Sequence, residues 1–184
     1  MPERPTLPTA RLVLRPFTKA DAPDVQRLAG EREVASTTLH IPHPYTIGMA
    51  EDWISTHQEA YERGALVNFA IVRRTDQALM GCIGLDIDPH HANAEMGYWI
   101  GIPFWSQGYC TEAAQTVIQY GFEVLRLHRI HAAHMARNPA SGRIMQKVGM
   151  TYEGCLRQHI QKWGAFEDIV VYGMLQSEYA GQRF

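Results

Sequence analysis

The segment Trp105-Ser-Gln-Gly-Tyr-Cys-Thr-Glu112 has residue types suited to holding a phosphate group. It lies between an expected strand and a long amphipathic helix, so its main-chain N–H groups face outward at a helix N-terminus, where anions are stabilised. Gly108 lets the chain approach a pyrophosphate closely, and Thr111 adds a hydroxyl donor. The alternative is that Gly108 only turns the chain into the helix. The spacing fits neither a Walker loop nor a dinucleotide fingerprint.

Three histidines, His128, His131 and His134, recur every three residues, a spacing that on a helix would gather metal ligands on one side. The surrounding residues predict a strand instead. Residues three apart on a strand alternate between its faces, so His131 would face away from the other two. We therefore expect no metal site here.

The three cysteines, Cys82, Cys110 and Cys155, are widely spaced. Their number and spacing fit neither a disulfide framework nor a cysteine-based zinc site, so reduced thiols are expected. Cys110 could be read as a nucleophile, but no base partner is near it in the sequence. A small packing residue is the favoured interpretation.

Short runs of branched and aromatic residues alternate with amphipathic stretches along the chain. The expected strands are 11–17, 66–74, 78–87, 94–100, 129–136, 151–162 and 167–175. The expected helices begin at Thr18, after Gly108 and at Pro139, and a further helix is expected from about Met49 to Arg63. This order implies one α/β domain over residues 1–184, with a mixed sheet of six to seven strands and helices on both faces.

Composition limits the classes of function. The chain has 184 residues, 46% of them hydrophobic, which suits one globular domain. Its formal charge of -2 gives no broad positive field, so no nucleic-acid partner is expected. No apolar run approaches the roughly 20 residues that span a bilayer, and the N-terminus lacks a secretory signal. We expect no membrane association and a cytoplasmic location.

Three segments, in this order, resemble a known family: TARLVLRPFTKAD from residue 9, EMGYWIGIPFWSQGYCTEA from residue 95 and NPASGRIMQKVGMTYEG from residue 138. They look like the Gcn5-related N-acetyltransferase (GNAT) superfamily, and most like its branch that acetylates N-terminal amines of ribosomal proteins. The resemblance runs from about Thr9 to Leu175. The acetyl-CoA loop of that superfamily follows the pattern Gln/Arg-x-x-Gly-x-Gly/Ala, and here Trp105, Gly108 and Cys110 occupy those positions.

The resemblance implies acetyl-CoA as co-substrate and a fold that binds it in three places. The pantetheine arm would pair with the main chain of Tyr98, Trp99 and Ile100. Asn138 and Ser141 would face the other side of the arm, although both could instead be structural residues of a helix start. The pyrophosphate would lie on the amides of Ser106, Gln107, Gly108, Tyr109, Cys110 and Thr111.

Thioester aminolysis needs a neutral amine, an oxyanion donor and a proton for the leaving thiolate. Glu95 matches an acidic position of the resembled branch, and is either the general base or a structural partner. A main-chain amide near Ile100 would bind the oxyanion. Ser141 would supply the proton, with Tyr152 and Tyr109 as alternatives. Direct attack by the amine requires no acyl-enzyme.

The leading hypothesis is an acetyl-CoA-dependent N-acetyltransferase that acts on a protein N-terminus, a peptide or a small amine, ribosomal protein N-termini included. The alternatives are a non-catalytic acyl-CoA-binding module of the same fold and a phosphate-binding structural domain. The loop 39–45 and the helix after it are expected to shape the acceptor pocket, with Trp163 of the final hairpin at its border. The sequence leaves the oligomeric state open, a homodimer included.

Overall fold

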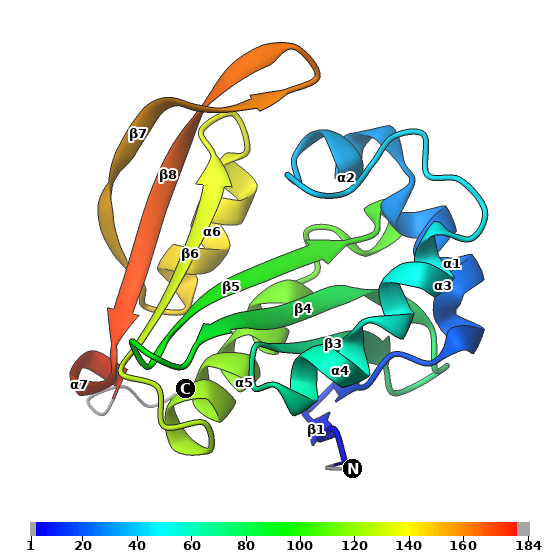
Figure 1. Ribbon diagram of the computed structural model, residues 1–184, viewed down its shortest axis with the longest axis horizontal. Coiled ribbons are helices and arrows are strands. Elements are labelled where there is room, and N and C mark those ends of the chain that lie inside the picture. Colours follow the sequence, from blue (N-terminus) through cyan, green and yellow to red (C-terminus); the bar gives the residue numbers. More distant parts are fainter. Residues whose placement is uncertain (1–2, 180–184) are drawn as a thin grey trace.

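A computed structural model describes residues 3–179, which form one eight-stranded mixed sheet (Figure 1). The strand order is β1-β2-β3-β4-β5-β6-β8-β7. The strands are β1 Leu7–Pro8, β2 Leu12–Arg15, β3 Leu66–Arg73, β4 Leu79–Asp88, β5 Asn93–Ile100, β6 Arg129–Met135, β7 Thr151–Lys162 and β8 Ala165–Leu175. Seven of them match sequence patterns. The eighth, β1, has two residues, which is too short for any periodicity to reveal.

The helices include the four that sequence patterns predict. They are α1 Ala22–Ala29, α2 Arg32–Ser36, α3 Met49–Ser55, α4 His57–Glu62, α5 Tyr109–Glu123, α6 Pro139–Lys147 and α7 Gln176–Tyr179, with short 3-10 turns at Lys19–Asp21 and Ile102–Phe104. The helix expected over residues 49–63 is divided into α3 and α4. Thr56, between them, donates its hydroxyl to the carbonyl of Trp53 at 2.8 Å, a bond of the kind that disturbs a continuing helix.

Two helical layers cover the sheet. The helices α5 and α6 pack on one face around a core that includes Phe69, Ile83 and Ile118, while α1 and α3 pack on the other around Phe17 and Ile54. Each buried side chain of this size contributes roughly 1.5–3 kcal/mol. The apolar stripe of α5 is confirmed. At Gly121 on that stripe, a β-carbon would come within 2.6 Å of Ile130, so glycine permits close helix–sheet packing there.

Two neighbouring strands in the middle of the sheet, β5 and β6, separate after a short paired stretch. β5 pairs with β4 along its whole length, from Asn93 to Ile100. It pairs with β6 in parallel over three residues only, Asn93–Glu95 against Arg129–His131. Beyond these residues β6 pairs only with β8, and Figure 1 shows β5 and β6 diverging from their shared start. One edge of β5 therefore has no partner strand from Met96 onward.

Within residues 3–179, no helix is both long and apolar enough to cross a bilayer.

Candidate active site

The open edge of β5 exposes main-chain groups to a cleft. Gly101 N–H donates to Met80 O at 2.8 Å. This bond shows which residues of β5 direct their main-chain N–H and C=O groups toward β4. Because main-chain groups of an antiparallel strand alternate in direction, Trp99 turns its N–H and C=O toward β4, whereas Tyr98 and Ile100 turn theirs toward the gap. Of the three residues expected to receive an extended arm, two thus offer free main-chain groups, and Trp99 contributes its side chain.

The end of this edge is closed by a side chain. Trp105 donates its indole N–H to Ile100 O at 2.6 Å. The carbonyl of Ile100 is thereby occupied, and the donor left facing the gap at the end of β5 is the Ile100 N–H. A main-chain N–H of this kind is a group that can stabilise an oxyanion.

The segment expected to bind the pyrophosphate is a turn that leads into α5. Ser106 and Gly108 have left-handed φ angles of 60° and 80°, and Gly108 precedes the first residue of α5. The first main-chain hydrogen bond of α5 runs from Glu112 N–H to Gly108 O at 3.1 Å. The amides of residues 109–111 therefore have no acceptor within the helix. Residues 106–108 are exposed, Tyr109 is buried, and Cys110 and Thr111 are partly buried.

Gln107 plays a different part from its neighbours. Its side chain donates to Pro103 O at 2.9 Å, and its carbonyl accepts from Arg11 at 3.0 Å. It does not line the cleft. Cys110 does, packed partly buried against the core, and burial raises the pKa of its thiol to about 12. A thiol of that pKa is a weak nucleophile near neutral pH, which agrees with its reading as a packing residue.

A single cleft of about 1600 Å³ runs through the open part of the sheet and is lined from both halves of the molecule. This exceeds the roughly 300–1,000 Å³ of an ordinary small-molecule pocket, leaving room for a long donor arm and an acceptor together. Of the residues expected at the site, those that line the cleft are Glu95, Tyr98, Trp99, Ile100, Ser106, Gly108, Tyr109, Cys110, Thr111, Asn138 and Ser141.

Glu95 lies where β5 and β6 part, and its side chain is 56% exposed. His131, its partner in the parallel pairing, places Nε2 at 3.9 Å from the Glu95 carboxylate. The other imidazole nitrogen of His131, Nδ1, lies 3.1 Å from Asn93 Oδ1. On the other side, Asp86 stands directly opposite Glu95 across the β4–β5 pair.

Asn138 and Ser141 come from the start of α6. Asn138 occupies the N-cap position, as its Asn-Pro sequence predicts, but its side chain makes no capping hydrogen bond. The alternative reading of Asn138 as a side-chain cap is therefore wrong, and Asn138 lines the cleft. Ser141 Oγ lies 2.9 Å from the phenol oxygen of Tyr98, which joins α6 to β5.

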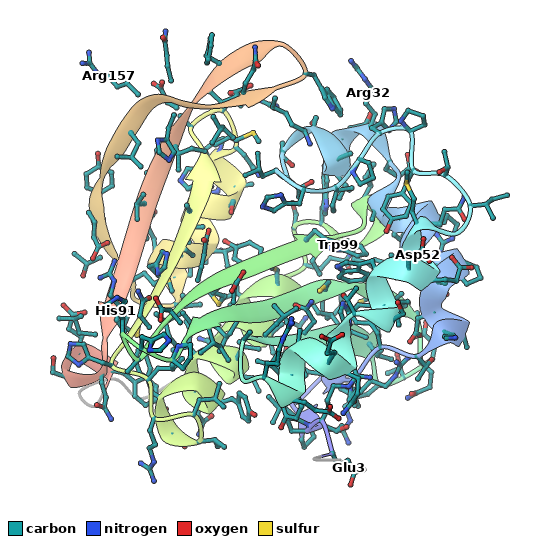
Figure 2. The ribbon with its side chains drawn as sticks, viewed as in Figure 1. Glu3, Arg32, Asp52, His91, Trp99 and Arg157 are labelled. Carbon is teal, nitrogen blue, oxygen red and sulfur yellow. The ribbon has the colours of Figure 1, made fainter. Side chains whose placement is uncertain are left out.

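The other half of the cleft is lined by the segments that the sequence assigned to an acceptor pocket. They are loop residues Leu39 to Pro42 and Tyr45, together with Met49, Asp52 and Trp53 of α3. In Figure 2, Trp99 lies between the sheet and α3, and Asp52 projects from α3.

The final hairpin contributes its strands rather than its tip. Leu156 and His159 of β7 line the cleft, whereas Trp163 does not. The Trp163 ring instead lies 5.7 Å from the ring of His43 and 5.4 Å from the guanidinium carbon of Arg32. The hairpin tip is thus attached to the loop that borders the cleft.

Sequence reasoning missed several residues that line the cleft, among them Asp86, His131, Arg143 and Lys147. The two basic residues are four apart on α6, a spacing that places them on one face of the helix. That signal was present in the sequence. Asp86 and His131 carried none, since only strand pairing places them beside Glu95.

The described residues contain no group of three or more His, Cys, Asp or Glu side chains placed to hold a metal ion. His131 and His134 both lie on β6, yet they contact different partners. His131 meets Asn93, and His134 packs against Tyr172 and beside Gly142 of α6.

Comparison with known proteins gives consistent results. The model of the acetyltransferase (GNAT) domain family matches residues 11–151. The uncharacterized N-acetyltransferase YoaA of Bacillus subtilis is 33% identical over 173 residues, which cover 94% of this chain and 97% of that protein. The crystal structure of a GNAT-family acetyltransferase from Bacillus anthracis superposes with a TM-score of 0.85 at 25% identity, over 95% of this chain and 100% of that one.

Two more distant relatives have named acceptors. The ribosomal-protein-serine acetyltransferase of Escherichia coli is 28% identical over 62% of this chain and 64% of its own length. The spermidine N(1)-acetyltransferase of Vibrio cholerae is 23% identical over 92% of this chain and 96% of its own length. Because the family model and a 33% identical relative match most of its length, the chain belongs to the GNAT family and is an acetyl-CoA-dependent N-acetyltransferase.

Proposed function

We propose that the acceptor is a primary amine at the end of a slender, extended chain, foremost the N-terminus of a polypeptide such as a ribosomal protein. The observation that carries this proposal is the pairing of Asp86 with Glu95 at the point where β5 and β6 part. Side chains directly opposite each other share a face of the sheet, and two like charges there are unfavourable without a cation. An acceptor ammonium supplies that cation.

The sheet beside these carboxylates is open at Gly97 only. Gly97 pairs with Gly84, but a β-carbon on Gly84 would clash with Asn68 Oδ1, so the Asn68 side chain covers that position. A β-carbon built on Gly97 would meet no atom within 4 Å, which means that it opens on free space. A narrow floor of this kind favours an extended chain over a bulky ring system. The relative that acts on ribosomal proteins supports the same class of acceptor.

The proposed mechanism assigns one group to each catalytic need. Glu95 takes a proton from the ammonium, and His131, 3.9 Å away, can pass that proton on to solvent. The neutral amine then attacks the thioester carbon directly, and the Ile100 N–H stabilises the oxyanion. Ser141 directs its hydroxyl hydrogen to the leaving sulfur. The pyrophosphate is held by the amides of residues 106–111.

A second acceptor class has specific support. Glu33 of α2 and Asp52 of α3 also line the cleft, so carboxylates are spread along it as well as gathered at Glu95. A polyamine has several ammonium groups that such spacing could bind. The similarity to a spermidine acetyltransferase points to the same class.

The test is an acceptor panel with the purified protein and acetyl-CoA, in which free thiol is measured and the acetylated product is located by mass spectrometry. The panel holds peptides with ribosomal-protein N-terminal sequences, the same peptides with blocked N-termini, and spermidine. Release with free but not blocked peptides supports the first acceptor class. Release with spermidine alone replaces it by the second, and release with neither removes both.

A further inference from the structure

Tyr98 and Ser141 form a hydrogen-bonded pair across the gap between β5 and α6. The phenol oxygen of Tyr98 lies 2.9 Å from Ser141 Oγ and 3.0 Å from Ser141 O. The backbone of Tyr98 belongs to the edge expected to bind the donor arm, and both residues line the cleft. The pair therefore lies beside the path of the thioester.

The two hydroxyl hydrogens of this pair allow two hydrogen-bonding arrangements. A phenol has one hydrogen, and Tyr98 has two acceptors within reach. If Tyr98 donates to Ser141 O, the Ser141 hydroxyl must donate to the phenol oxygen, and it presents only lone pairs to the cleft. If Tyr98 donates to Ser141 Oγ, the Ser141 hydrogen is free to point into the cleft. Only the second arrangement can serve a leaving thiolate.

The second arrangement leaves no acceptor unsatisfied. Ser141 is the third residue of α6, and its carbonyl lies four residues before Met145, whose N–H reaches it in regular helix geometry. The Ser141 carbonyl therefore keeps a hydrogen-bond donor even when the Tyr98 hydroxyl does not donate to it. A hydroxyl that accepts one hydrogen bond also becomes a better donor of the next.

The environment keeps the phenol protonated. Burial raises the pKa of Tyr98 above its ordinary value, with the nearby Cys110 adding to the rise. Tyr98 thus remains a neutral hydrogen-bond donor throughout the physiological pH range, and does not itself give up its proton.

We propose that Tyr98 is a positioning residue that turns the Ser141 hydroxyl into a hydrogen-bond donor for the departing sulfur. This inference rests on the proposed role of Ser141. As the C–N bond forms and the C–S bond breaks, the electron pair of the broken bond goes to sulfur, where the Ser141 hydrogen stabilises it. The proton stays on oxygen, because an alcohol is a weaker acid than a thiol. Glu95 has released the first proton of the ammonium to water, and the nitrogen loses its second proton to water as the amide forms. The thiolate takes one proton from water, so one proton is released overall.

A double-mutant cycle tests the proposal, with Tyr98→Phe, Ser141→Ala and both together. Acceptor-dependent thiol release gives kcat and the KM for acetyl-CoA. Loss of one hydrogen bond predicts that Tyr98→Phe lowers kcat about tenfold with little change in KM. In the S141A background the same change should have no further effect, because the group that Tyr98 positions is already gone. Ser141→Thr, which keeps a hydroxyl, should restore the dependence on Tyr98.

Two results would overturn the proposal: an equal loss from Tyr98→Phe in the Ser141 and S141A backgrounds, or no loss in either. Thermal unfolding of each variant shows whether a loss of kcat comes from misfolding. If Ser141→Ala is misfolded, the effect of Tyr98→Phe is compared between the wild type and the folded Ser141→Thr variant. The same thiolate leaves when water replaces the amine, so the cycle is measured on acetyl-CoA hydrolysis as well. If no amine is acetylated, the proposed acceptors fail while the coupling between Tyr98 and Ser141 is still measured.

Discussion

Arg11 and Glu112 are 101 residues apart in the chain, and their side chains form an ion pair at 2.7 Å beneath the phosphate loop. Arg11 also donates to Gln107 O at 3.0 Å, and its guanidinium lies 4.5 Å from the centre of the Tyr109 ring. The Arg11 side chain, which immediately precedes β2, thus contacts the loop on both sides of Gly108. The geometry of the loop proposed to bind phosphate therefore depends on a residue that is distant in the sequence.

Arg11→Lys should weaken binding of acetyl-CoA. Lysine keeps the charge but lacks the planar fork that contacts Glu112 and Gln107 together. We expect the KM for acetyl-CoA to rise about fivefold to tenfold, with kcat at saturation little changed, in a steady-state assay of thiol release. Arg63→Lys is the matched control, because the exposed pair of Arg63 with Glu59 lies on α4, away from the loop. Equal KM values for the two variants would contradict this role of Arg11.

Glu95→Gln and Asp86→Asn should have different kinetic effects. Removing a general base lowers kcat by about 10²-fold or more. Removing a carboxylate that only attracts the ammonium raises the KM for the amine and leaves kcat largely intact. We therefore expect a kcat defect in Glu95→Gln and a KM defect in Asp86→Asn, measured with one acceptor over a range of concentrations. A KM defect alone in both variants would assign binding, not base catalysis, to Glu95.

Gly108→Ala should damage the phosphate site beyond its effect on stability. Both Gly108 and Gly64 have left-handed φ angles, 80° and 66°, so alanine at either position is strained by about 1 kcal/mol. A β-carbon on Gly64 would meet no atom within 4 Å, which makes Gly64→Ala a control for strain alone. We expect similar losses of Tm in both variants, but weaker acetyl-CoA binding by calorimetry only in Gly108→Ala. Unchanged affinity in Gly108→Ala would mean that phosphate does not approach this residue.

Lys162→Met should loosen the loop that borders the acceptor end of the cleft. Lys162 is 7% exposed and donates from Nζ to Leu39 O at 3.2 Å and Ile41 O at 3.1 Å. Without these bonds we expect faster limited proteolysis within the loop and a higher KM for the acceptor, while the KM for acetyl-CoA stays the same. Lys19→Met removes an exposed lysine and serves as the control. Proteolysis that is no faster than in the control would rule out an anchoring role.

His57 should make the protein sensitive to acid. It is 2% exposed, and burial, with Arg4 adding to the effect, lowers its pKa from 6.5 to about 4. Between those pH values the unfolded chain binds a proton at His57 that the folded chain does not, so the free energy of unfolding falls as pH falls. The contribution is complete above pH 6.5, and its loss reaches about 3 kcal/mol by pH 4.

The measurement is urea unfolding at pH 7 and pH 4.5 for the wild type and His57→Gln. The variant starts from lower stability, because it loses the bond between His57 Nε2 and Asn68 at 3.2 Å. Its stability should nevertheless fall less between the two pH values. His90→Gln, in an exposed turn, should keep the wild-type pH dependence. A wild-type slope in His57→Gln would show that His57 does not titrate in this way.

The local elements of the fold could be predicted because their causes are local. The α5 stripe is set by residue spacing, the start of α6 by Asn138-Pro139, and the helical turn after Thr18 by Asp21, whose carboxylate accepts from Thr18 N–H at 2.7 Å. The pattern predicted too long a helix at Thr56, because the hydroxyl of this residue bonds to the Trp53 carbonyl between α3 and α4.

The amino-acid sequence by itself determined the order of strands and helices, the glycine turn ahead of α5 and the family resemblance, since each depends on residues close in the chain. Only the tertiary structure decided that β5 and β6 part after Glu95, and that Asp86, His131 and Tyr98 meet their partners there. Strand pairing joins residues tens of positions apart, and no local spacing encodes which residues will face each other or where a ladder of hydrogen bonds will stop.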